Sequence, residues 1–62
     1  MNTIKKPLLI IYEIADRASR VTSKTAFRQF ERWIKKTIRT YQDEALEQVA
    51  RIHLFRLKEL YG

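Results

Sequence analysis

Apolar residues recur at helical spacing along most of this chain. Between residues 24 and 41 they recur at spacings of three and four, which places these side chains on one face of an α-helix. The pattern therefore predicts an amphipathic helix that begins near Lys24. The apolar face of this helix consists of Ala26, Phe27, Phe30, Trp33, Ile34, Ile38 and Tyr41.

A preceding helix is predicted from residue 3 to about residue 20, with Thr3 as its cap. Pro7 falls in its first turn, where the missing N–H has no helical partner to lose. A strand over residues 8–12 is the alternative, because periodicity alone cannot assign a short apolar run after a proline. The predicted core face of the helix consists of Ile4, Leu8, Ile11, Ile14, Ala15 and Ala18.

Two breaks in the helical pattern are expected. The first follows the preceding helix, where two β-branched residues and a serine are poor helix formers, and Thr22 or Ser23 can cap the next helix. The second lies near Thr40 and Asp43, which resemble a capping box; Asp43 could itself cap a third helix. The third segment has a broad apolar face made of Ala45, Leu46, Val49, Ala50, Ile52, Leu57, Leu60 and Tyr61, with Leu54 at its edge and Phe55 outside it.

Length and composition favour a single small all-α domain over residues 1–62. One glycine and one proline are too few turn residues for an all-β fold. We expect a bundle of three helices. A two-helix hairpin is the alternative, because apolar residues stay in line at eleven-residue intervals from Phe27 to Leu60 and allow one long second helix.

The absence of cysteine removes disulfides and thiolate zinc sites as sources of stability. The longest apolar run spans only residues 8–12, whereas a membrane span needs about 20 residues. We therefore expect a soluble, cytoplasmic protein that depends on packing between helices.

The charge is one-sided: 13 Lys and Arg residues stand against seven Asp and Glu residues, a formal net charge of +6. Most of the excess lies on the second helix, where six cations share an arc of about 120° opposite the apolar face. We name this set the cationic stripe. It consists of Lys24, Arg28, Arg32, Lys35, Lys36 and Arg39.

Such a stripe favours an acidic partner, and we expect a small regulatory or accessory protein that contacts DNA or RNA backbones. Base-specific contact is not expected, because Gln29 is the only amide near the stripe. The alternative is an interaction module or inhibitor that docks on an acidic protein surface. Membrane attachment is less favoured, because the apolar face of the same helix must close the core.

Catalytic chemistry is not expected. Ser19 and Ser23 have no nearby histidine, and the chain has no glycine-rich phosphate loop. His53 is the single histidine and lies within the apolar arc of the third helix, so we expect a packed residue and no metal or other cofactor. Arg56 shares this arc, with Glu13 and Asp16 as candidate ion-pair partners.

The chain has more large apolar residues than one internal face of the bundle can hold. Leu9 and Ile10 lie off the face of the first helix, and Phe55 lies off the face of the third, so a monomer would expose them. We therefore expect a homodimer or a docked partner. The expected interface consists of Leu9, Ile10, Leu54, Phe55, Leu57 and Tyr61.

Overall fold

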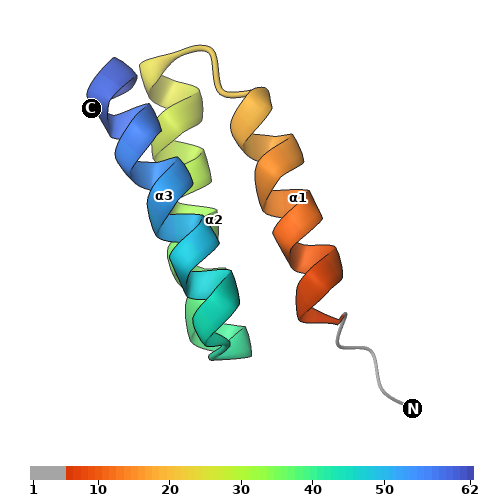
Figure 1. The fold of residues 1–62 in the computed structure, drawn as a ribbon. Coiled ribbons are helices and arrows are strands. Elements are labelled where there is room, and N and C mark those ends of the chain that lie inside the picture. The colour runs from red at the N-terminus through yellow and green to blue at the C-terminus, as the bar shows by residue number, and fades with distance from the viewer. Residues whose placement is uncertain (1–5) are drawn as a thin grey trace.

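The computed structural model of this chain describes residues 6–62. This part of the chain contains three helices and no strand: α1 (Pro7–Ser19), α2 (Lys24–Tyr41) and α3 (Glu44–Tyr61). In Figure 1, α1 and α3 run in the same direction, and α2, which lies between them in the sequence, runs in the opposite direction. The predicted all-α fold with three helices is therefore confirmed.

The start of α1 agrees with the expected role of its proline. Pro7 occupies the first turn, and the carbonyl of Lys6 accepts hydrogen bonds from the amides of Leu9 and Ile10. The expected cap Thr3 lies outside the described residues. The alternative of a strand over residues 8–12 is wrong, because these residues are helical.

Ser23 and Asp43 mark the starts of α2 and α3. The Ser23 hydroxyl accepts a hydrogen bond from the amide of Ala26 at 3.1 Å, and the Asp43 carboxylate accepts one from the amide of Leu46 at 2.9 Å. Each cap satisfies a backbone donor that has no partner inside its helix. Thr40 is not a cap, because its hydroxyl donates to the carbonyl of Lys36 within α2.

Gln42 separates α2 from α3. Its backbone is left-handed, with φ 48° and ψ 44°, and its amide donates to the carbonyl of Ile38 at 2.9 Å. This conformation ends the helix, so the alternative of one continuous helix to residue 60 is wrong. The short connections place consecutive helices antiparallel to each other.

Each helix contributes one large, fully buried side chain to the core: Ile14 from α1, Ile34 from α2 and Leu46 from α3. The predicted face of α2 is buried or packed against this core. Thr37, which the apolar pattern omits, is also buried, and its hydroxyl donates to the carbonyl of Trp33 at 2.8 Å. This bond satisfies the only polar side chain in the core of the described residues.

The buried row of α1 differs from the predicted one. It consists of Ile10, Ile14 and Ala18, whereas Leu8 is 60% exposed and Ala15 is exposed. The expectation that Ile10 would be exposed is wrong, because only 3% of it is accessible. Five consecutive apolar residues cover more than one face of a helix, so their spacing cannot select which row faces α2 and α3.

The broad apolar face of α3 is only partly covered. Leu46, Ala50 and Leu57 are buried, but Ile52 and Leu60, which belong to the predicted apolar face, are 66% and 69% exposed. An apolar arc of this width needs neighbours on more sides than α1 and α2 occupy. The bundle therefore leaves apolar surface on α3.

We predict that Gln42→Gly stabilises the fold. Glycine adopts a left-handed backbone without the steric cost that a side chain adds, so the free energy of unfolding should rise by about 1 kcal/mol and the melting temperature by about 4–8 °C. Urea and thermal unfolding followed by circular dichroism measure the change.

Gln48→Gly is the matched control, because Gln48 is an exposed glutamine inside α3. Glycine there should lower the free energy of unfolding by about 1 kcal/mol. A decrease in stability for both variants would contradict the role assigned to Gln42.

Candidate nucleic-acid interface

All six residues of the cationic stripe are exposed on α2. The helix is anchored by the buried row Phe27, Phe30, Ile34 and Thr37, which lies on the opposite side. This arrangement follows from helical spacing, because the cations and the apolar residues occupy opposite arcs of one α-helix. The structure therefore brings the predicted stripe together on one outward surface.

The acidic residue on α2 neutralises little of the stripe. The Glu31 carboxylate lies 3.7 Å from the ammonium group of Lys35, and the lysine side chain is 67% exposed. Exposed pairs of this kind contribute between 0 and about 1 kcal/mol. Glu31, Lys35, Arg28 and Arg32 together line a shallow depression on this surface. Six cations against one anion leave α2 with a formal charge of +5.

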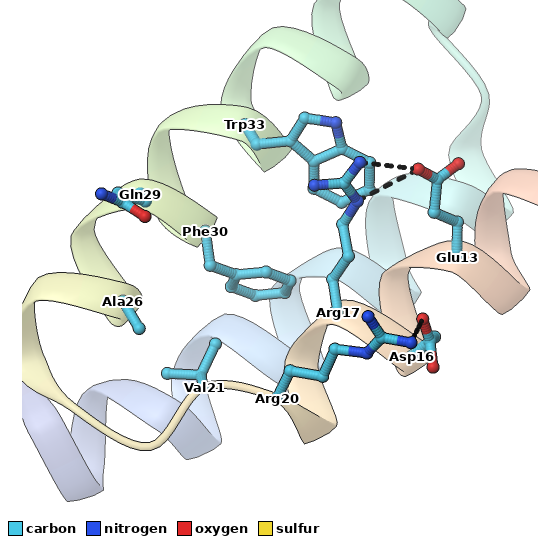
Figure 2. Close-up of a pocket in the computed structure, with 9 residues that line it drawn as sticks. All are labelled: Glu13, Asp16, Arg17, Arg20, Val21, Ala26, Gln29, Phe30 and Trp33. Atoms are coloured by element: carbon cyan, nitrogen blue, oxygen red, sulfur yellow. Dashed lines mark hydrogen bonds and ion pairs between the residues drawn. The ribbon is translucent and has the colours of Figure 1, made fainter.

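A groove runs between α1 and α2 (Figure 2). Its lining combines aromatic, apolar, amide and charged side chains from both helices and from the connection between them. These residues are Glu13, Asp16, Arg17, Arg20, Val21, Ala26, Gln29, Phe30 and Trp33.

Arg17 and Trp33 contact each other in this groove. The Arg17 guanidinium lies over the indole ring of Trp33, with its carbon 4.3 Å from the ring centroid. Its Nε and Nη2 atoms each lie 3.0 Å from Oε2 of Glu13. The Arg17 cation thus contacts both an aromatic face and a carboxylate, and each contact stabilises its position.

Sequence reasoning did not identify this groove. The spacing of Glu13 with Arg17 and of Asp16 with Arg20 is i, i+4, which signals the ion pairs seen along α1 and at its C-terminal end. Trp33 was expected in the core, yet it is only partly buried and lies at the edge between α1 and α2. No local pattern links Arg17 to Trp33, because their contact depends on how α1 is seated on α2.

The residues predicted for an interface fall into three groups. Leu9 and Phe55 are exposed, as expected from their positions off the apolar faces. Leu54 and Tyr61 are partly buried against the core. Ile10 and Leu57 are core residues of the monomer. The large apolar side chains that the described part of the chain exposes are Leu8, Leu9, Tyr12, Ile52, Phe55 and Leu60.

His53 is partly buried on α3, next to Arg56. Nη2 of Arg56 lies 3.1 Å from Nδ1 of His53, and because arginine can only donate, Nδ1 accepts this bond in the neutral ring. Burial of the imidazole and, secondly, the positive charge of Arg56 lower the pKa of His53 below its ordinary value of 6.5. The ring is therefore a neutral packing residue at pH 7.

Membrane spans and metal clusters are both absent from residues 6–62. In this part of the chain, no helix has the length and apolarity needed to cross a bilayer. The same residues contain no cluster of three or more histidine, cysteine, aspartate or glutamate side chains placed to hold a metal ion.

Comparison of the chain with protein-family models, with curated proteins and with solved structures gives no match.

We predict that His53 makes stability depend on pH. Because its pKa is lower in the folded chain than in the unfolded one, the unfolded chain binds more protons in acid. The His53 contribution should be fully present above about pH 6.5 and should be lost as the pH falls through the folded pKa.

Urea unfolding of the parent chain and of His53→Gln, from about pH 5 to about pH 8, isolates this effect from that of the carboxylates. Glutamine keeps an acceptor for Arg56 and does not titrate. The parent midpoint should fall relative to the variant below about pH 6.5. If the unfolding midpoints of the two proteins change with pH by the same amount, His53 has no such role.

Proposed function

We propose that this chain is a small non-enzymatic, cytoplasmic regulatory or accessory protein that binds the backbone of DNA or RNA through the cationic stripe. One observation carries the proposal: six exposed cations share one outward face of α2, opposite the face that closes the core. From Lys24 to Arg39 the stripe is roughly 22 Å long, enough to follow several phosphates.

The placement of charge on α2 supports a binding role over simple solubility. Its first turn carries Lys24 and no acidic residue, although the helix dipole favours a negative charge there. By contrast, the first turn of α3 carries Glu44 and Glu47, which is the stabilising arrangement. The first-turn charge of α2 is therefore not the one that helix stability alone would favour.

The residue types suit phosphate contact without base specificity. Arginine can place two N–H groups on one phosphate, and lysine supplies a mobile point charge. Affinity should therefore depend steeply on salt, with a log–log slope of about −0.9 for each phosphate contacted on duplex DNA.

We predict that Arg28→Glu combined with Arg32→Glu abolishes binding to a labelled duplex, measured by fluorescence anisotropy at about 50–200 mM salt. The matched control is Arg56→Glu combined with Lys58→Glu on α3. Each pair of reversals lowers the formal net charge by four, from +6 to +2, so only position differs.

The control should change the affinity by less than about threefold. Equal losses of affinity in both double variants would mean that binding depends on net charge and not on the stripe. Parent binding that does not respond to salt would contradict backbone contact.

A docking module for an acidic protein is the second candidate, because Leu9 and Phe55 add exposed apolar surface to the molecule. Affinity purification with and without nuclease separates the two candidates. The second candidate would be favoured if an acidic protein stays bound after nuclease treatment and no longer binds the Phe55→Ala variant.

We also propose that the chain forms a homodimer through the exposed apolar residues of α3 and α1. Ile52 and Phe55 lie three residues apart on α3, are 66% and 69% exposed, and would gain from burial against a second copy. The expected interface includes Leu9, Leu54 and Tyr61 at its margins.

We predict that sedimentation velocity from about 1 µM to about 100 µM shows a monomer–dimer equilibrium, and that Phe55→Asp shifts it to monomer. The charge would be buried without a partner in the dimer but solvated in the monomer. A parent chain that stays monomeric over this range would contradict the proposal.

A further inference from the structure

The cationic stripe borders the groove between α1 and α2. Gln29 and Trp33 line the groove and directly follow Arg28 and Arg32 in the sequence. Lys36 lies one helical turn beyond Trp33, and residues at this spacing have Cβ atoms about 5–6 Å apart. A strand whose phosphates lie on the stripe would therefore have its bases within reach of the groove.

Arg17 presents a flat surface in this groove. One face of its guanidinium lies over the indole of Trp33, and Glu13 holds the edge of the group through two nitrogen atoms (Figure 2). The Arg17 side chain remains 48% exposed. Guanidinium planes and aromatic rings are the surfaces on which unstacked bases pack.

The groove is chemically different from the stripe. Its two arginines, Arg17 and Arg20, are each paired with a carboxylate, from Glu13 and Asp16, so its formal charge is zero. Phosphates are attracted to the stripe, which has a large excess of positive charge. A neutral groove with an aromatic floor and polar edges suits a nucleobase, whose faces are apolar and whose edges donate and accept hydrogen bonds.

We propose that the α1–α2 groove binds a nucleobase of a single-stranded nucleic acid by stacking it on the Arg17–Trp33 pair. The inference rests on the proposed function, because the stripe supplies the backbone contacts. Base pairing and stacking in a duplex keep the bases out of the groove, so the chain should prefer single strands to duplexes of equal length. The preorganised guanidinium lowers the entropic cost of this contact.

Trp33 is the single tryptophan of the chain and reports occupancy of the groove directly. The experiment compares a single-stranded oligothymidine with an abasic strand of the same length and charge, measured by tryptophan fluorescence and by anisotropy. Oligothymidine should quench Trp33 and bind about tenfold more tightly than the abasic strand. Both strands should show the same salt slope, about −0.7 for each phosphate contacted.

Arg17→Lys tests the stacking surface without changing charge. Lysine can still pair with Glu13 but has no planar group, so the preference for oligothymidine over the abasic strand should fall to about twofold or less. Arg51→Lys is the matched control. Arg51 is also exposed and forms the same i, i+4 pair, with Glu47 at 2.7 Å, on α3. This variant should keep the full preference.

The outcomes separate the two proposals. Equal binding of both strands, with a steep salt dependence and no quenching, would overturn base stacking and leave the stripe as the binding surface. No binding of either strand at low salt would overturn the nucleic-acid function itself. A preference that survives Arg17→Lys unchanged would also contradict the groove as the base site.

Discussion

The fold depends on one small core that three helices share. Ile14, Ile34 and Leu46 are fully buried, and each comes from a different helix. With no cysteine in the chain, no covalent link can replace this packing. The core therefore commits the apolar face of α2 to the interior, and helical geometry then places the cations of α2 outward.

The same constraint accounts for the groove. Trp33 lies on α2 at the border between the apolar face and the charged face, so it cannot be covered by the core alone. Arg17 from α1 completes its packing with a charged group, and Glu13 balances that charge. A cationic surface and an amphipathic groove thus meet along one side of α2, and the two candidate binding features follow from a single packing arrangement.

The sequence predicted α2 well and the other helices in part. Strong periodicity and a capping serine specify α2, and Asp43 signals the start of α3. The buried row of α1 could not be predicted, because residues 8–12 are all apolar and tertiary packing selects among them. For α3, Ile52 and Leu60 share the apolar arc with buried residues, yet no neighbouring helix covers them. The contact between Arg17 and Trp33 joins helices whose relative rotation no local pattern encodes.

The central claim is that nucleic acid contacts the α2 stripe and the adjoining groove. Amide and indole chemical shifts, recorded by heteronuclear NMR while a short single strand is added, test it residue by residue. The largest changes should fall on Arg28, Arg32, Lys36 and the Trp33 indole N–H, with little change on the outer side of α3 at Ile52 and Phe55. Changes centred on α3, or none at low salt, would contradict the account.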